Sequence, residues 1–216
     1  MKGEAIIEVR NLVNRFGAQT VHQDLALDLY RGEVLGVVGG SGTGKSVLLR
    51  SILGLRRANS GTVRVFGEEL LSLPPERRSQ LERRFGVLYQ RGALFSSLTV
   101  TENTALPLIE HAGLTRAAAE RLAQVKLALV GLPRGAGDKY PTELSGGMIK
   151  RAALARALAL EPEVLLLDEP FGALDAKVRK ELRRWLRHLH EQISVTSIFV
   201  THDQEEAMEV SDQVVV

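Results

Sequence analysis

The chain combines short apolar runs with longer stretches in which apolar residues recur every three to four positions. The short runs predict strands over residues 6–13, 25–29, 33–38, 62–66, 85–89, 164–168 and 197–202, and we expect 62–66 and 85–89 to pair. The longer stretches predict helices over residues 46–53, 74–84, 117–130, 146–160 and 175–192. Strands that alternate with helices favour a mostly parallel sheet with helices on both faces.

One stretch interrupts this alternation. Residues 101–155 carry helical spacing and no strand signal, which indicates a helical subdomain inserted into the α/β core. The β-like stretches before residue 33 predict an N-terminal antiparallel β subdomain. We therefore expect one domain over residues 1–216, with a core at about 1–90 and 156–216 and a helical subdomain at about 91–155.

Composition narrows the class of protein. With 216 residues, of which 44% are hydrophobic, the chain can bury the core of one domain. Its 28 basic and 26 acidic residues leave a net charge of +2, so no nucleic-acid partner is expected. There is no cysteine, which excludes disulfides and thiolate metal sites, and no apolar run long enough to span a membrane. We expect a cytoplasmic protein that serves any membrane process by docking onto another polypeptide.

A glycine-rich segment carries the first chemical signal. The sequence G-G-S-G-T-G-K-S fits the pattern G-x-x-x-x-G-K-S, in which backbone N–H groups surround phosphate oxygens at the start of a helix. In that pattern Lys45 reaches the β- and γ-phosphates, and the Ser46 hydroxyl binds Mg²⁺. A flexible turn is the alternative, but strand, loop and helix follow in the order that a phosphate loop requires. The predicted loop comprises Gly39, Gly40, Ser41, Gly42, Thr43, Gly44, Lys45 and Ser46.

A pair of acids ends the predicted strand V-L-L-L-D-E. Parallel sheets bind their ligands at the carboxyl ends of their strands, where Asp168 and Glu169 fall. Asp168 is suited to the Mg²⁺ shell, and Glu169 is suited to orient or deprotonate an attacking water. The alternative is a helix cap, but a phosphate loop in the same chain favours a site that hydrolyses a nucleoside triphosphate.

With the motif L-S-G-G at residues 144–147, these features resemble the nucleotide-binding subunit of an ABC (ATP-binding cassette) transporter, from about Glu8 to Val216. The resemblance implies a P-loop ATPase fold in which two chains bind two ATP molecules, with Mg²⁺, in a head-to-tail homodimer. It also implies that Ser145, Gly146 and Gly147 contact the γ-phosphate held by the second subunit. A flexible turn capped by serine is the alternative for this motif.

Four further positions match the family's pattern. Gln90 resembles the glutamine that senses the γ-phosphate and Mg²⁺ and links the site to the transmembrane permease. His202 resembles the histidine that contacts the γ-phosphate, and Asp175 resembles the loop that crosses the dimer interface. Phe16 resembles the aromatic residue that stacks on adenine. Each of three positions also has an ordinary structural interpretation. Gln90 could be a solvated loop residue, His202 a structural histidine and Phe16 a core residue.

The chain departs from the family at two places. Met148 stands where the family usually has glutamine, which removes a polar side chain from the contact with the second subunit. The last valines, residues 214–216, fall in the middle of a predicted strand, so we expect the family's pattern to continue beyond them.

The substrate signals differ along the chain. The phosphate loop, the segment after Gln90 and L-S-G-G-M resemble Mla-type ATPases of phospholipid trafficking, whereas the sequence from Asp168 onward resembles sulfate and thiosulfate import ATPases. We favour lipid trafficking, because the helical subdomain and the region after Gln90 contact the permease in such proteins. This implies a site at the cytoplasmic face of a bacterial inner membrane, with a permease and an Mce-type substrate-binding protein as partners. Sulfate import is the alternative, and a soluble ABC protein outside transport is the alternative of another class.

Overall fold

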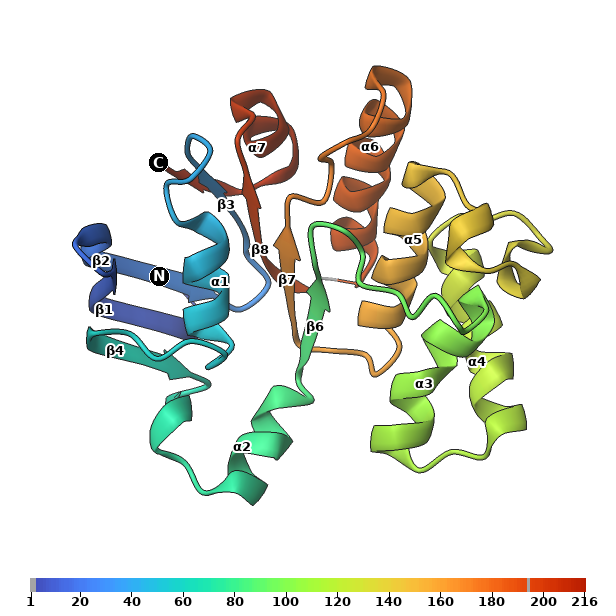
Figure 1. Ribbon diagram of the computed structural model, residues 1–216, viewed down its shortest axis with the longest axis horizontal. Helices are drawn as coiled ribbons and strands as arrows, with labels where there is room; N and C mark the ends of the chain where they lie inside the picture. The colour runs from blue at the N-terminus through green and yellow to red at the C-terminus, as the bar shows by residue number, and fades with distance from the viewer. Residues whose placement is uncertain (1–2, 194) are drawn as a thin grey trace.

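The computed structural model describes residues 3–193 and 195–216, which form two β-sheets and the helices around them (Figure 1). Within these residues the larger sheet has five strands in the order β6-β7-β8-β3-β9, and all neighbours are parallel. Its strands are β3 (Val34–Val38), β6 (Phe85–Leu88), β7 (Val164–Asp168), β8 (Thr196–Thr201) and β9 (Gln213–Val215). The α/β fold with a parallel sheet is thereby confirmed.

The central strands end together at one edge of this sheet. Every side chain of β8 is buried, as expected for a parallel strand that is covered on both faces. Val38 pairs with Thr201, and Leu88 pairs with Leu167 on the neighbouring strands. Because parallel strands run in one direction, the loops that follow β3, β6, β7 and β8 leave the sheet side by side.

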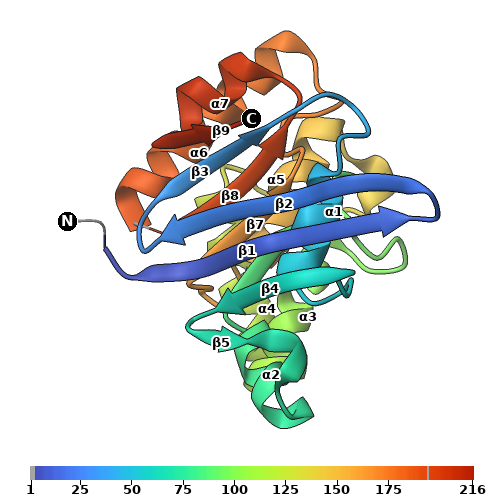
Figure 2. The same cartoon turned by 90° about the vertical axis from the view of Figure 1, so that its left-hand side faces the viewer.

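A second sheet covers one side of the molecule (Figure 2). It is antiparallel, with the order β2-β1-β4-β5, and its strands are β1 (Ala5–Phe16), β2 (Gln19–Tyr30), β4 (Ser60–Val65) and β5 (Glu68–Glu69). Its buried residues, including Ile7 and Leu29, pack with Leu48 and Ile52 of α1 (Lys45–Ile52). Helix α1 is thus held between the two sheets (Figure 1), and the expected antiparallel β subdomain is confirmed.

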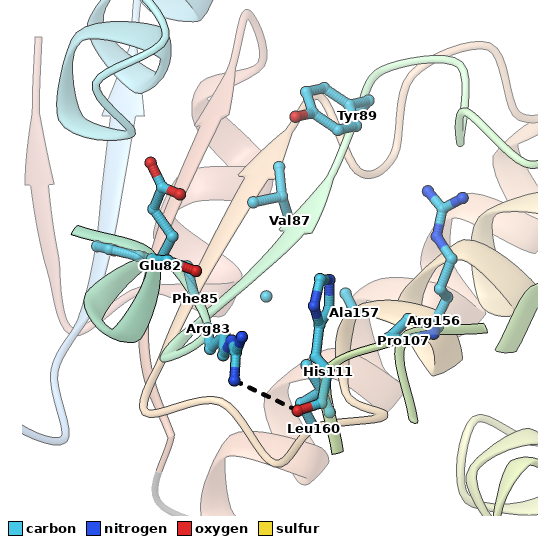
Figure 3. A pocket seen from close by; sticks show the side chains of 12 residues that line it. Glu82, Arg83, Phe85, Val87, Tyr89, Pro107, His111, Arg156, Ala157 and Leu160 are labelled. Carbon is cyan, nitrogen blue, oxygen red and sulfur yellow. Dashed lines mark hydrogen bonds between the residues drawn. The ribbon is translucent and has the colours of Figure 1, made fainter. Parts of the chain in front are cut away.

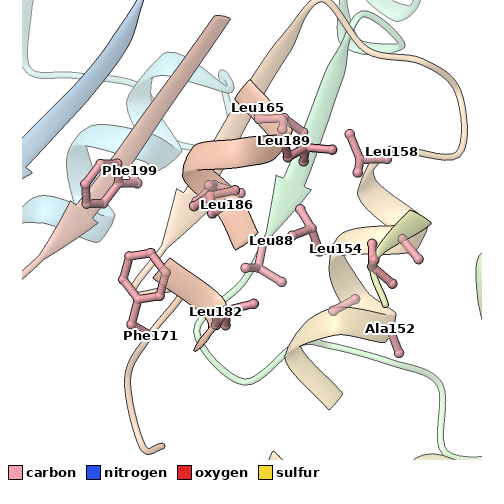
Figure 4. Packing of buried hydrophobic residues seen from close by; sticks show 14 of the residues in the cluster. Leu88, Ala152, Leu154, Leu158, Leu165, Phe171, Leu182, Leu186, Leu189 and Phe199 are labelled. Atoms are coloured by element: carbon pink, nitrogen blue, oxygen red, sulfur yellow. The ribbon is translucent and has the colours of Figure 1, made fainter. Parts of the chain in front are cut away.

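The other face of the parallel sheet is covered by α5 (Gly146–Ala157) and α6 (Ala176–Ile193). Leu182, Leu186 and Leu189 recur at helical spacing along α6 and are buried. They belong to a core with Leu88 and Leu165 of the sheet (Figure 4), and the rings of Phe171 and Phe199 meet edge to face with centroids 6.0 Å apart. This core fixes α5 and α6 on strands that carry site residues.

Residues between β6 and α5 form helices. Helix α3 (Val100–Ala112) begins with a capping box in which Thr99 and Glu102 exchange hydrogen bonds, and α4 (Arg116–Leu129) packs against it. Short 3₁₀ turns at Ala136–Asp138 and Pro141–Glu143 lead to α5. The remaining helices are the 3₁₀ helix Leu70–Ser72, α2 (Pro75–Glu82) and α7 (Gln204–Val210). Among the residues described, no helix combines the length and apolar character that a membrane span requires.

The two strands expected at residues 62–66 and 85–89 do not pair with each other. The first is β4, which pairs with β1 and β5 in the antiparallel sheet, while β6 pairs with β7 in the parallel sheet. Their burial explains this separation. β6 is mostly buried and suits the covered sheet, whereas β4 is largely exposed and suits a sheet with a solvated face.

Candidate functional site

The loop after β3 contains glycines at positions without room for a side chain. Gly44 has φ 98°, and a Cβ atom there would lie 2.2 Å from Val21 Cγ1. A Cβ atom at Gly39 would lie 2.7 Å from Thr43 Oγ1. Helix α1 begins directly after the loop at Lys45, and the free N–H groups of a helix N-terminus attract anions. The local shape therefore fits a phosphate group.

Lys45 is buried against this loop, at 8% exposure. Its Nζ donates hydrogen bonds to the carbonyl oxygens of Gly39 and Gly40, both at 2.7 Å. The ammonium group is thus held over the loop, where it can act as a point charge toward phosphate oxygens.

Ser46 joins the loop to the neighbouring part of the sheet. Its Oγ donates a hydrogen bond to Asp168 Oδ1 at 2.8 Å, which connects the first turn of α1 to the end of β7. Burial raises the pKa of Asp168, the hydrogen bond from Ser46 lowers it, and the charge of Glu169 raises it. No cluster of three or more His, Cys, Asp or Glu side chains suited to a metal occurs among the described residues. The hydroxyl and carboxylate oxygens nevertheless fit Mg²⁺, which completes its shell with phosphate oxygens and water.

Glu169 lies between two other residues that the sequence singled out. Gln90 Nε2 donates to Glu169 Oε2 at 3.0 Å, and His202 Nδ1 lies 3.5 Å from Glu169 Oε1. Glu169 N donates to Val200 O on β8 at 3.0 Å, which fixes the start of this loop. The ends of β6, β7 and β8 thus bring one amide, one carboxylate and one imidazole together.

The L-S-G-G segment forms the N-terminus of α5. Ser145 caps this helix, because its Oγ accepts a hydrogen bond from Met148 N at 3.4 Å, and its side chain is exposed. A Cβ atom at Gly147 would lie 2.5 Å from Val178 Cγ1, so glycine lets α5 approach α6 closely. Met148 packs partly buried against the core, which accounts for an apolar side chain at this position.

Asp175 caps the neighbouring helix. Its Oδ1 accepts hydrogen bonds from Lys177 N at 3.1 Å and Val178 N at 3.0 Å, and its side chain is exposed. A Cβ atom at Gly146 would lie 3.5 Å from Leu174 Cδ2. The L-S-G-G segment and the Asp175 loop are therefore neighbours at the ends of α5 and α6.

Phe16 lies at the end of β1 and is not part of the core. Its side chain is 46% exposed, and the Arg56 guanidinium lies 3.8 Å from the ring centroid. Arg56 is itself held by Asn14 Oδ1 at 3.3 Å and by Arg15 O at 2.9 Å. One ring face is therefore covered by a fixed cation.

A groove lies next to Gln90. It is a cavity of about 300 Å³ between β6, α2, α3 and α5. Its lining residues include Arg83, Val87, Tyr89, His111 and Arg156 (Figure 3). Arg83 Nη1 donates to His111 O at 3.4 Å across its base. Tyr89 precedes Gln90 directly, so the groove and the Glu169 carboxylate are connected through two consecutive residues.

The sequence did not point to two buried groups at the site. Lys150 donates to the carbonyls of Gln90 and Glu169, and His22 lies next to Gly44. Burial lowers the pKa of Lys150, and the charges of Asp168 and Glu169 oppose this shift. Lys150 falls on the same face of α5 as buried Gly147 and Leu154, which is a sign of burial, but the sequence does not show the carbonyl groups that it contacts. For His22 the sequence carries no comparable signal.

The family model of the ABC transporter matches residues 22–172, which cover the loop, the groove, L-S-G-G and the acids. This chain belongs to the ABC transporter family. Its fold is similar to a dimeric bacterial ABC transporter cassette, MJ0796, with a TM-score of 0.87, 29% identity and coverage of 97% of this chain and 93% of that one. It is also similar to cbiO1 of Clostridium perfringens, with a TM-score of 0.86, 26% identity and coverage of 98% and 84%.

Curated relatives of this ABC protein share about half of its residues. The sulfate/thiosulfate import ATP-binding protein CysA of Bradyrhizobium diazoefficiens is 53% identical over 213 residues, which are 97% of this chain and 60% of that protein. The corresponding protein of Cucumis sativus is 50% identical over 212 residues, or 97% and 59%. The chain thus spans about three fifths of the length of these relatives. Their names support the sulfate alternative, and they do not support our expectation of lipid trafficking with an Mce-type partner.

Proposed function

We propose that this chain binds and hydrolyses ATP as the nucleotide-binding subunit of an ABC transporter. The hydrogen bond between Ser46 and Asp168 is the observation that carries this proposal. This bond joins the first turn of α1 to the end of β7, so it supports a single site that combines the glycine loop with Asp168 and Glu169. A phosphate loop alone supports nucleotide binding, whereas the adjacent carboxylates support hydrolysis.

In this proposal each group has a distinct role. The loop from Gly39 to Gly44 and Lys45 bind the β- and γ-phosphates, while Ser46, Asp168 and Gln90 hold Mg²⁺. The bound cation neutralises charge that develops on the phosphate oxygens. Glu169 orients the attacking water and accepts its proton.

His202 donates toward the γ-phosphate in the same proposal. Its Nδ1 faces Glu169, which restrains the ring beside the reacting group. Phe16 stacks on adenine with its uncovered face, and stacking of this kind suits an exposed aromatic ring.

We further propose that the active unit is a homodimer. Ser145 and Gly146 are exposed at the N-terminus of α5, where a phosphate of a second chain is attracted by free N–H groups. The Asp175 loop adjoins this surface and would cross the interface. Each of two ATP molecules would then lie between the loop of one chain and the L-S-G-G segment of the other.

A transmembrane permease is the proposed partner of the groove beside Gln90. A polypeptide segment of the permease that binds against Tyr89 would shift Gln90, the next residue, whose side chain donates a hydrogen bond to Glu169. This contact would couple the permease to hydrolysis. This assigns the chain to the cytoplasmic face of a bacterial inner membrane, peripherally bound. A soluble ABC protein outside transport would instead purify without a membrane partner.

For the transported substrate, we propose sulfate or thiosulfate import. Support comes from relatives of that name at 48 to 53% identity over 97% of the chain. Phospholipid trafficking is the second candidate, because Met148 and the segment after Gln90 carry its resemblance.

The test reconstitutes the ATPase in liposomes together with the two membrane-spanning subunits of its transporter. We expect ATP hydrolysis to rise severalfold with a sulfate-loaded binding protein, and Glu169→Gln to abolish the response. Stimulation by phospholipid transfer to an Mce-type protein instead would support the second candidate. Failure to co-purify with any permease would contradict the transport assignment.

A further inference from the structure

Lys150 is a buried cation close to the site that the proposed chemistry does not use. It lies in the first half of α5 and is 5% exposed. A buried ammonium loses its hydration, and it persists in a protein only where hydrogen bonds and opposite charge replace the water. The hydrogen-bond partners of Lys150 therefore indicate what this buried ammonium group does in the structure.

Both partners are backbone carbonyls of site segments. Lys150 Nζ donates to Gln90 O at 2.5 Å and to Glu169 O at 2.8 Å. These segments follow β6 and β7, which are adjacent parallel strands. One ammonium group thus connects α5 to the two strand ends that supply the amide and the carboxylate.

The bond to Glu169 acts on an unusual backbone position. Glu169 has φ 46°, in the left-handed region that favours glycine. Its carbonyl accepts from Gly172 N at 3.1 Å as well as from Lys150, while its carboxylate accepts from Gln90 Nε2. The orientation of the Glu169 peptide determines where its carboxylate points, and Lys150 is one of the few groups that hold this peptide.

We propose that Lys150 is a positioning residue that fixes Glu169 and Gln90 in the geometry needed to activate water. It also links them to the L-S-G-G segment, because Ser145 caps the helix that carries Lys150. The inference rests on the proposed role of Glu169 in hydrolysis.

A purely structural lysine would behave differently. Its loss would lower stability and affect nucleotide binding and turnover together. A positioning residue changes the maximal rate and leaves ground-state binding nearly unchanged. Its effect on the rate also becomes smaller when a group that it positions has been removed.

The test uses Lys150→Met and Lys150→Gln in the full-length ATPase assembled with its permease. We expect Lys150→Met to lower kcat by at least about tenfold and to change KM for ATP by less than about threefold. Lys150→Gln should be intermediate, because its amide can still donate to a carbonyl. The matched control is Lys126→Met in α4. Lys126 Nζ donates a hydrogen bond to Glu161 Oε1 at 3.0 Å, and this pair lies outside the site.

A second comparison places Lys150→Met in the Glu169→Gln background. Single-turnover hydrolysis should then fall by a clearly smaller factor than in the parent background, because the carboxylate is already absent and only the contact with Gln90 is still lost. The inference would be overturned by a normal kcat in both Lys150 variants. It would also be overturned if Lys150→Met lowered the hydrolysis rate by the same factor in the Glu169→Gln background as in the parent. If Lys150→Met does not fold, Lys150→Gln decides alone. Normal turnover of Glu169→Gln by itself would instead show that the proposed role of Glu169 has failed.

Discussion

Gln90 donates a hydrogen bond from Nε2 to Glu169 Oε2 at 3.0 Å, which joins the segment after β6 to the segment after β7. The preceding residue, Tyr89, lines the groove between the sheet and the helices. A displacement of this segment by a bound partner therefore changes the contacts of the Glu169 carboxylate.

Replacement of Glu169 by glutamine should separate binding from hydrolysis. The variant keeps the shape of the side chain and its contact with Gln90 but loses the base, so we expect hydrolysis to fall by roughly a hundredfold or more. ATP affinity should stay within about threefold of the parent. Glu181→Gln on the exposed face of α6 is the control, and near-normal turnover would remove Glu169 from its role.

Lys45→Ala should weaken ATP binding and abolish turnover together. The ammonium is held over the loop by Gly39 and Gly40, and a charge-assisted bond to phosphate contributes about 1.5 to 3 kcal/mol. We expect affinity to fall by about tenfold to a hundredfold in a titration followed by calorimetry. Lys180→Ala, at an exposed site, is the control. Unchanged affinity in a folded variant would contradict the assignment of the loop.

Ser145→Arg should prevent the ATP-dependent dimer. In the Glu169→Gln background, Mg-ATP should double the molar mass in light scattering, because hydrolysis no longer opens the complex. Adding Ser145→Arg places bulk and charge where the proposed composite site would hold the second chain's nucleotide, and the mass should then remain that of one chain. A Glu169→Gln protein that stays monomeric with Mg-ATP, both alone and with its permease, would contradict the composite site.

Phe16→Leu should reduce affinity for ATP but not for inorganic tripolyphosphate. Aromatic stacking contributes about 0.5 to 1.5 kcal/mol beyond area burial, so we expect a loss of affinity of about twofold to tenfold. Phe16→Tyr retains the ring and serves as the control. Equal losses for both ligands would indicate a structural role at the end of β1 instead of recognition of the base.

His190 should make the fold less stable at acidic pH. Its Nδ1 lies 2.8 Å from Leu186 O and its Nε2 lies 2.5 Å from Ser197 Oγ, and burial lowers its pKa. The unfolded chain therefore binds a proton more readily than the folded chain as pH falls below about 6.5.

The stability that the neutral ring contributes is thus present above about pH 6.5 and is lost as pH falls through the lowered pKa, by at most about 1.4 kcal/mol per pH unit. Urea unfolding at pH 7.5 and pH 5.5 should show a smaller difference for His190→Gln than for the parent. His188→Gln, at an exposed position, is the control. An equal change in stability with pH in all three proteins would contradict His190 as the origin of the pH dependence.

Local sequence patterns predict the parts of the candidate site that lie within one strand and the loop after it. The apolar strands before Gly39 and Asp168, and the glycines between Gly39 and Gly44, predict a phosphate loop and strand-end acids, and the structure has a strand at each of these places. The end of α4 was also predictable, because Gly131 follows it with φ 70°. In contrast, α5 ends at Ala157 and not near residue 160, since helix propensity alone does not mark its last turn.

Features that depend on distant contacts were beyond the sequence. Arg56 stacks on the ring of Phe16 although the two residues are 40 positions apart in the sequence, and no local sequence pattern indicates this contact. Lys150 appears as an ordinary charge in an alanine-rich helix until the fold brings the carbonyls of Gln90 and Glu169 to it. The transported substrate depends on partners outside the chain. For this reason some segments resembled ATPases of phospholipid trafficking and others resembled ATPases of sulfate import.

The left-handed backbone at Glu169 sets function against stability. A non-glycine residue in this region costs on the order of 1 kcal/mol, and glycine would avoid that cost but supply no carboxylate. If Glu169 has the proposed role in hydrolysis, selection for stability alone would favour glycine at position 169 at the expense of activity. A screen of variants for thermal stability is therefore expected to enrich glycine at this position unless it also selects for ATP hydrolysis.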